Sequence, residues 1–512
     1  MGCRMQQDNS GIKANTRTAL YYFAVLAGAI VFYVISCAPG ALWQDSGMIQ
    51  YRVLHNDIKG GMGLALSHPL FYMLAIGTKF IPFGGFIYKV NLVAVIAAAV
   101  AVANVFLFLR LWLGKTLPAV VGSVSLAVSH TFWWHAEAVE TYTLYTAVLT
   151  AELIMLLQYV RTRQTGYLYW LGLLNGLSIA EHMLGSIPFL CYAVFIVVLL
   201  AKKHIRAGNF AIIVLLWIAG AMPYEYLIVR ELIQTGEFVA TLKSAAFGSS
   251  WQGAVLNTSL SLKITKENII WILLNFPTPN ILLLFVGLAV LYRVGPSKWF
   301  SSIIMTLLVL FLVFAFRYTI VDRYAFFIPF YCMVSILMGV GASVFFGRER
   351  RKVLAWLILL LILLPIPVYA AAPKLAQQIG VKSGRGRETP YRNDYTYFLL
   401  PWKTGYTGAD RFANDALTEA ADKAIIYADG STAYSLLLAQ EIGGKRPDVT
   451  IVSGHGTINN LNDYNDSISS KLYTQRVVYV VSPVAGYCPQ FLLERYDFEK
   501  TGVLYKAVEK KK

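Results

Sequence analysis

The chain has 512 residues, of which 57% are hydrophobic and 14% charged, and its mean hydropathy is +0.56. Soluble domains carry about 25% charged residues, so this composition excludes an ordinary soluble protein and indicates an integral membrane protein. The net charge of +16 does not argue for nucleic acid as a partner, because most of the surplus lies in the apolar part of the chain, where the positive-inside bias of membrane proteins explains it.

Apolar segments of the length that a bilayer requires recur through the first part of the chain. Lipid offers no partner to an unpaired backbone group, so each segment is expected to be helical. The fold class is therefore predicted to be a polytopic α-helical membrane protein. About 11 transmembrane helices are expected, at 18–38, 87–109, 117–134, 138–160, 167–181, 183–201, 209–228, 274–292, 299–316, 325–346 and 353–371.

The loops between these segments alternate in charge. Every second loop is basic, and the acidic residues fall mostly in the others. By the positive-inside rule the N-terminus is then cytoplasmic. The loop at 40–85, the turns near 135–140, 181–182 and 317–324, and everything after residue 369 are expected on the outer side.

After residue 371 the composition becomes that of a soluble domain, so we divide the chain into a membrane domain at 1–371 and a smaller domain at 372–512. A Gly/Arg-rich linker at 382–387 leads into the smaller domain. Strands are predicted at 424–428, 449–452 and 476–481, and a helix at 431–442. This alternation favours a small extracytoplasmic α/β domain.

The first outer loop carries an acid just beyond the first span. Asp45 follows Trp43, a predicted interfacial anchor, and precedes Gly47. In this position Asp45 can act as a general base that takes a proton from an acceptor hydroxyl. The alternative is structural, with Asp45 or Ser46 capping the helix that follows.

The same loop carries a histidine in an apolar stretch. His68 is held before Pro69, which restrains its backbone. Its imidazole can donate to a phosphate or orient the acid, and the alternative is a histidine that is merely satisfied at the interface.

A second polar cluster occupies the turn between the predicted third and fourth spans, and contains His135, Glu137, Glu140 and Tyr142. If the segment is helical, the spacing of three residues places Glu137 and Glu140 on one face. Such a pair can bind substrate hydroxyls or a divalent metal, and we favour hydroxyl binding because no specific ligand signature is present.

Two further outer turns hold charged side chains. One contains His182, and the other contains Arg317, Asp322 and Arg323. The planar guanidinium of arginine suits a lipid phosphate. The alternatives are an Asp322–Arg323 pair and an arginine that reaches back to the interface.

No cofactor is firmly implied. The sequence contains no Walker or GxGxxG loop and no zinc-protease motif. Its five cysteines are scattered and form no CxxC or Cys/His cluster, so neither a disulfide framework nor a cysteine-based metal site is indicated.

Three polar segments together resemble a known family. Trp43 to Gly47, Ser67 to Phe71 and Thr131 to Tyr142 are similar, in order and spacing, to the membrane protein family, long of unknown function, that includes the vertebrate transmembrane protein O-mannosyltransferase. The likeness covers about residues 15–200. That family looks like a branch of the C-type glycosyltransferases (GT-C), which are multi-span enzymes that use polyprenyl-phosphate sugars.

The resemblance implies a function for these residues. GT-C enzymes carry a catalytic acid in the first outer loop, and by position Asp45 corresponds to it. His68, Glu137 and Glu140 fall in the shared motifs. The expected activity is an inverting, O-mannosyltransferase-like transfer of a sugar from a polyprenyl-phosphate donor to a hydroxyl of a protein, glycan or lipid. Arg323 or Arg317 would steady the departing phosphate, with help from His68.

The expected setting is a multi-pass position in the membrane, with a bacterial inner membrane preferred and membrane lipid as a further partner. A transporter or flippase for a lipid-linked or small polar substrate is the alternative function. That class predicts ionisable residues near mid-bilayer, of which Glu152 is the main acidic one, and broken helices in paired halves. No internal repeat is evident in the sequence.

Overall fold

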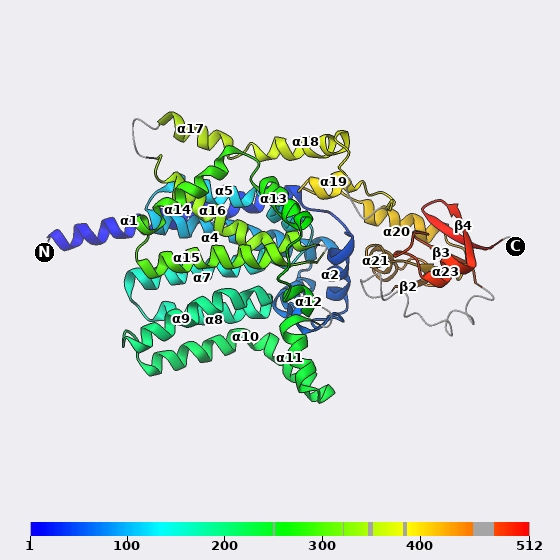
Figure 1. Cartoon of the computed structure of the whole chain (residues 1–512), viewed down its shortest axis with the longest axis horizontal. Helices are drawn as coiled ribbons and strands as arrows, with labels where there is room; N and C mark the ends of the chain where they lie inside the picture. The colour runs from blue at the N-terminus through cyan, green and yellow to red at the C-terminus, as the bar shows by residue number, and fades with distance from the viewer. Residues whose placement is uncertain are drawn as a thin grey trace.

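The computed structural model describes residues 2–248, 251–320, 322–346, 352–381, 387–453 and 476–510, with side chains from residue 16 onward. All but the last residue of the predicted linker at 382–387 lies outside these ranges. Long helices run side by side in one bundle, and the C-terminal domain lies beyond one end of it (Figure 1). The chain is a multi-pass integral membrane protein with a small C-terminal sheet domain, as predicted.

The bundle contains most of the long helices. They are α1 (Gly2–Ser36), α4 (Phe86–Leu113), α5 (Thr116–Ala127), α6 (His130–Glu137), α7 (Tyr142–Thr162), α8 (Gly166–Glu181), α9 (Ser186–Ala201), α10 (Ala207–Thr235), α13 (Leu262–Asn275), α14 (Leu282–Val294), α15 (Lys298–Arg317), α16 (Ile328–Ala342), α17 (Lys352–Leu361) and α18 (Pro365–Gln378).

Within the described ranges, 7 helices are long and apolar enough to cross a membrane, or up to 9 if each of two bent pairs is one span. The two remaining predicted spans correspond to α5, of 12 residues, and α8, of 16 residues. Both are shorter than the roughly 17 to 25 residues that a bilayer-spanning helix needs. The 16-residue helix nevertheless packs tightly against α10, because a Cβ added to Gly176 would lie 2.1 Å from the backbone oxygen of Trp217.

The two bent pairs are α13 with α14, at 103°, and α17 with α18, at 45°. The first break contains Pro277 and Pro279, which cannot continue a helix. Backbone groups freed inside a membrane protein need partners, and side chains supply them. Tyr369 donates its hydroxyl to the carbonyl oxygen of Asn275 at the first break (3.2 Å), and Asn280 donates to the carbonyl oxygen of Ile358 before the second (3.0 Å).

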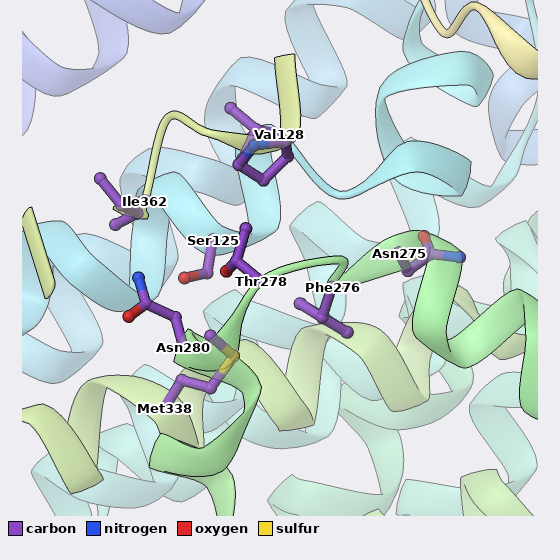
Figure 2. A pocket seen from close by; sticks show the side chains of 9 residues that line it. Ser125, Val128, Asn275, Phe276, Thr278, Asn280, Met338 and Ile362 are labelled. Carbon is purple, nitrogen blue, oxygen red and sulfur yellow. The ribbon is translucent and has the colours of Figure 1, made fainter. Parts of the chain in front are cut away.

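A small pocket lies where the two breaks meet (Figure 2). Polar side chains from Ser125, Thr278 and Asn280 face apolar ones from Met338 and Ile362. Its volume of about 10 Å³ is close to the room that one water molecule needs. The pocket is therefore a feature of the helix breaks and is too small to hold a sugar.

Short helices gather at the end of the bundle that faces the C-terminal domain (Figure 1). We call residues 37–85, 129–141, 181–185, 236–248, 251–261, 318–320 and 322–327 the loop end. It contains α2 (Gln44–Leu54), α3 (Pro69–Gly77), α11 (Phe238–Phe247), α12 (Gln252–Val255), and the 3-10 helices η1 (Leu64–Leu66), η2 (Thr78–Phe80), η3 (Met183–Gly185) and η5 (Arg323–Phe327).

The C-terminal domain is built on one five-stranded sheet of order β2-β1-β3-β5-β4. β1 pairs in parallel with β2 and β3, and β5 pairs antiparallel with β3 and β4. The elements are α19 (Asp394–Leu399), α20 (Gly408–Glu419), β1 (Ile425–Tyr427), α21 (Ala433–Gly443), β2 (Thr450–Val452), β3 (Val478–Val480), α23 (Gln490–Arg495), β4 (Tyr496–Thr501) and β5 (Leu504–Glu509).

One apolar core joins this domain to the loop end. Leu42 and Trp43 of the first loop, and Trp134 of α6, belong to the same buried cluster as Phe412 of α20 and Ile426 of β1. Burial of apolar surface is the main favourable term in association. The C-terminal domain is therefore packed onto the first loop of the membrane domain.

Candidate active site

Three carboxylates from distant segments come together at the loop end. Asp45 lies in the first turn of α2, Glu140 lies between α6 and α7, and Asp322 precedes η5. Burial raises the pKa of Glu140 well above its ordinary value, and the negative charges of Asp45 and Asp322 raise it further. The structure thus brings three of the predicted site residues into one electrostatic cluster.

The side chain of Asp45 is exposed at the start of α2. The N-cap of this helix is Trp43, so neither Asp45 nor Ser46 caps it, and the alternative reading from the sequence is wrong. An acid in the first turn still interacts favourably with the helix dipole. Gln44, directly before it, has a left-handed backbone (φ 58°) and donates its amide to the carbonyl oxygen of Ser431 (3.2 Å).

A continuous row of rings lies beside the carboxylates. Ring centroids are 4.9 Å apart between His68 and His182, 5.2 Å between His182 and Tyr142, 5.4 Å between Tyr142 and His135, and 5.7 Å between His135 and Tyr324. Asp45, Glu140 and Asp322 all interact electrostatically with the two tyrosines. Four more predicted residues therefore belong to the same site.

The row begins at His68, which also has a left-handed backbone (φ 49°). Its Nδ1 lies 2.7 Å from the carbonyl oxygen of Glu181, so Nδ1 carries the proton and donates it. Burial, with the nearby Arg52 guanidinium, lowers the pKa of His68 to about 4. The imidazole is then neutral at pH 7, and its Nε2 is a hydrogen-bond acceptor.

The predicted pairing of Glu137 with Glu140 on one helix face is wrong. α6 ends at Glu137, and Ala138 has an extended backbone (φ −98°, ψ 108°), so the two residues are not one helical turn apart. The buried Glu137 accepts a hydrogen bond from the hydroxyl of Ser36 (2.7 Å) and lies near the ammonium of Lys403. It belongs to the junction with the C-terminal domain.

The two predicted phosphate-binding arginines are engaged by protein groups. Arg317 donates to the carbonyl oxygens of Val255 and Asn257. Arg323 forms an ion pair with Glu267 on α13, and its guanidinium lies over the ring of Trp271, 4.4 Å from the centroid. These contacts give both arginines a structural role at the bundle end.

Arg52 is a cation at the site that the sequence analysis did not single out. It lies seven residues after Asp45, two turns along the same face of α2. Its buried guanidinium lies 3.7 Å from the ring centroid of Tyr72, forms an ion pair with Asp57 (3.5 Å) and donates to the carbonyl oxygen of Ser67 (3.3 Å). The spacing of seven residues between Asp45 and Arg52, in a segment predicted to be helical, was the sequence signal that could have identified Arg52 as a site residue.

A metal ion has no obvious ligand set in the part of the chain that the structure describes. No group of three His, Cys, Asp or Glu side chains there is arranged to hold one. The possible divalent metal stays a prediction.

The overall architecture is similar to that of two solved membrane proteins. ArnT from Cupriavidus metallidurans bound to undecaprenyl phosphate aligns with a TM-score of 0.62 at 13% identity, over 95% of this chain and 97% of that one. The oligosaccharyltransferase of Archaeoglobus fulgidus in the apo form aligns with a TM-score of 0.50 at 12% identity, over 90% and 69%. At these identities the likeness establishes the fold.

The chain is therefore a polytopic membrane protein with the fold of the GT-C glycosyltransferases. Residues 65–208 match the family model described as Protein O-mannosyl-transferase TMEM260 N-terminal domain. This match confirms the family resemblance over the second and third polar segments, and it includes His68, the cluster at 135–142 and His182, whereas Asp45 precedes the matched residues.

Proposed function

We propose that this protein is a membrane glycosyltransferase that moves a sugar from a polyprenyl-phosphate donor to a hydroxyl acceptor. The observation that carries the proposal is the cluster of Asp45, Glu140 and Asp322, with the row of rings beside it, at one end of a GT-C fold. The matching family model is named for protein O-mannosyl transfer, which supports mannose as the sugar and Ser/Thr as the acceptor. A glycan or lipid hydroxyl is the other acceptor class.

In the proposed reaction Asp45 is the general base. It takes the proton of the acceptor hydroxyl while the acceptor oxygen forms a bond to the anomeric carbon. The bond from that carbon to the phosphate oxygen breaks, and its electron pair leaves with the phosphate, which inverts the anomeric centre. The exposed carboxylate of Asp45 suits this role because both the acceptor and solvent can reach it.

Arg52 is the cation that we assign to the departing phosphate, in place of Arg317 and Arg323. All three arginines have protein partners, and for Arg52 these include Asp57 and the carbonyl oxygen of Ser67. The choice rests on position, because Arg52 lies on the same face of α2 as Asp45. A fixed positive charge near the breaking bond stabilises the charge that develops there. The neutral His68, with Nε2 as an acceptor, suits a sugar hydroxyl better than a phosphate.

The lipid-facing surface offers room for the donor's isoprenoid chain. A groove of about 280 Å³ between α9 and α15 is lined mostly by apolar side chains, among them Val194, Phe195 and Trp299. α9 begins four residues after His182, and α15 ends at Arg317, so both helices lead to the loop end. A prenyl chain in this groove would have its phosphate directed toward the site.

The proposed orientation places the loop end and the C-terminal domain on the outer face, with the N-terminus cytoplasmic. Its support is the alternation of basic and acidic loops along the sequence. A bacterial inner membrane is the proposed location.

Transfer can be tested with purified protein, polyprenyl-phosphate mannose and a Ser/Thr-containing peptide. We expect mannosyl peptide from the parental protein, and a loss of about 10²-fold or more in Asp45→Asn, with the same donor affinity and melting temperature. An intact Asp45→Asn protein with the parental rate would remove Asp45 from the mechanism.

The transporter alternative requires a different outcome, namely movement of the donor across proteoliposomes without release of its sugar. Its main sequence feature was Glu152, which in the structure accepts hydrogen bonds from Ser178 and Asn175 inside the bundle. That contact gives Glu152 a structural partner on the neighbouring helix.

A further inference from the structure

We propose that Tyr434 of the C-terminal domain is an acceptor-binding residue, which forms the acceptor side of the site next to Asp45 and helps to determine which hydroxyl is glycosylated. This inference rests on the proposed function. It adds that the site is completed by a domain that lies more than three hundred residues further along the chain.

The helices α2 and α21 lie side by side and run in the same direction. At their beginnings the amide of Gln44, the first residue of α2, donates to the carbonyl oxygen of Ser431, just before α21 (3.2 Å). Near their ends the hydroxyl of Tyr51 on α2 donates to Glu441 on α21 (2.8 Å). The first turn of α21 therefore lies beside the first turn of α2, which carries Asp45.

Tyr434 is in that first turn. A Cβ added to Gly47 would lie 3.3 Å from the Cβ of Tyr434, and the rings of Tyr434 and Tyr51 are 5.7 Å apart. Gln44, Gly47 and Tyr51 share one face of α2 by their spacing, so α21 covers that face. Asp45 lies at its border, between the C-terminal domain and the carboxylate cluster.

The chemistry of the Tyr434 side chain suits a hydroxyl ligand. The ring is half-buried, and burial together with the charge of Asp45 raises the pKa of the phenol. It stays neutral and can donate or accept a hydrogen bond. Arg52 of α2 and Asp57, which follows that helix, are the other charged groups that act on it, and among the described residues its hydroxyl has no hydrogen-bond partner.

The topology of the sheet supports a ligand at this edge. From β1 the chain passes through α21 to β2 on one side, while β3 lies on the other side of β1. In open α/β sheets ligands bind at the carboxyl ends of the strands where the strand order reverses. Ser431 follows the carboxyl end of β1 and touches Gln44, so that edge adjoins the residue before Asp45.

The test uses full-length protein, polyprenyl-phosphate mannose and a Ser/Thr-containing peptide. We expect Tyr434→Phe to raise the KM for peptide about tenfold, as expected for one lost hydrogen bond, and Tyr434→Ala to raise it further. The KM for the donor and the slow hydrolysis of the donor by water should not change. Tyr505→Phe, on β5 of the same domain, is the matched control and should behave as the parent.

Failure of this inference is distinct from failure of the proposed function. If the parental protein neither transfers nor hydrolyses the donor, both proposals fail. If it does, and the Tyr434 variants keep the parental KM for peptide, only the role of Tyr434 is overturned. A rise in the KM for the donor, or a fall in melting temperature in Tyr434→Phe, would also overturn it by showing a merely structural role.

Discussion

Nδ1 of His68 lies 2.7 Å from the carbonyl oxygen of Glu181, and this contact joins the N-terminus of α3 to the C-terminus of α8. The left-handed backbone of His68 (φ 49°) is uncommon for residues other than glycine, although histidine, like Asn and Asp, adopts it more often than most. The imidazole is thus fixed by its own backbone and by a partner on another helix.

The lowered pKa of His68 predicts that the folded protein loses stability at acidic pH. The folded group titrates at about 4, whereas the unfolded group titrates near 6.5. Between these values the unfolded chain binds a proton that the folded chain does not, so the free energy of unfolding falls as pH decreases from about 6.5 to about 4. His68→Asn, which tolerates the left-handed backbone, should flatten that decline in melting temperature. The exposed His204→Asn should not, and equal slopes in the two variants would contradict the pKa assignment.

We expect lysine variants of Arg52 and Arg323 to have different phenotypes. Lysine keeps the charge of arginine but loses its planar fork. We expect Arg52→Lys to raise the KM for the donor about tenfold, because a charge-assisted contact with the phosphate is weakened. Arg323→Lys should instead lower the melting temperature by disturbing the pair with Glu267, with little change in the KM for the donor. The reverse pattern would return the phosphate to Arg323.

Glu137 is a buried acid at the junction between the two domains. We expect it to make the folded protein less stable as the pH rises. Burial raises the pKa of Glu137 well above its ordinary value, although the Ser36 hydroxyl and Lys403 partly oppose this. The folded chain then holds a proton that the unfolded chain loses above about 4.5, so the stability that this group contributes decreases as pH rises through the raised pKa.

Glu137→Gln tests that assignment. Glutamine is neutral and nearly isosteric, so the variant should match the parent near pH 5 and exceed its melting temperature at pH 8. The exposed Glu499→Gln on β4 is the matched control and should follow the parent at both values. A Glu137→Gln protein that is less stable than the parent at pH 8 would show that the ionised acid is favourable in the fold.

Much of the membrane domain could be predicted because local composition determines it. The apolar run predicted at 299–316 is the helix Lys298–Arg317, and the run predicted at 87–109 is the helix Phe86–Leu113. The end of α6 at Glu137 could not be predicted, since no proline or glycine follows it in the next three residues. The spacing rule for Glu137 and Glu140 failed at that point.

The composite nature of the site could not be predicted for a different reason. Ala41 and Asp410 form a hydrogen bond although they are 369 residues apart. Local periodicity predicts the face that a helix buries, but it does not name the segment that covers the face. The strands β1, β2 and β3 of the C-terminal domain were predicted, whereas β4 and β5 were not, and the contact of the domain with α2 was visible only in the structure.

That contact gives a last prediction, on the approach of Gly40 to α20. A Cβ at Gly40 would lie 1.9 Å from Oδ2 of Asp410, which also accepts from the amide of Ala41 (3.1 Å). Gly40→Ala should therefore displace the Asp410 carboxylate, break that bond and disturb the turn before Asp45. We expect a loss of transfer rate of about fivefold to tenfold, the effect of about one hydrogen bond.

A double variant makes the prediction specific. In an Asp410→Ala background the clash is absent, so adding Gly40→Ala should cost little more, and the two effects should be non-additive. Gly208→Ala, at the start of α10 where nothing lies within 4 Å of an added Cβ, is the matched control. Additive losses in the double variant would mean that Gly40 acts independently of Asp410, and that the docking of α20 does not position Asp45.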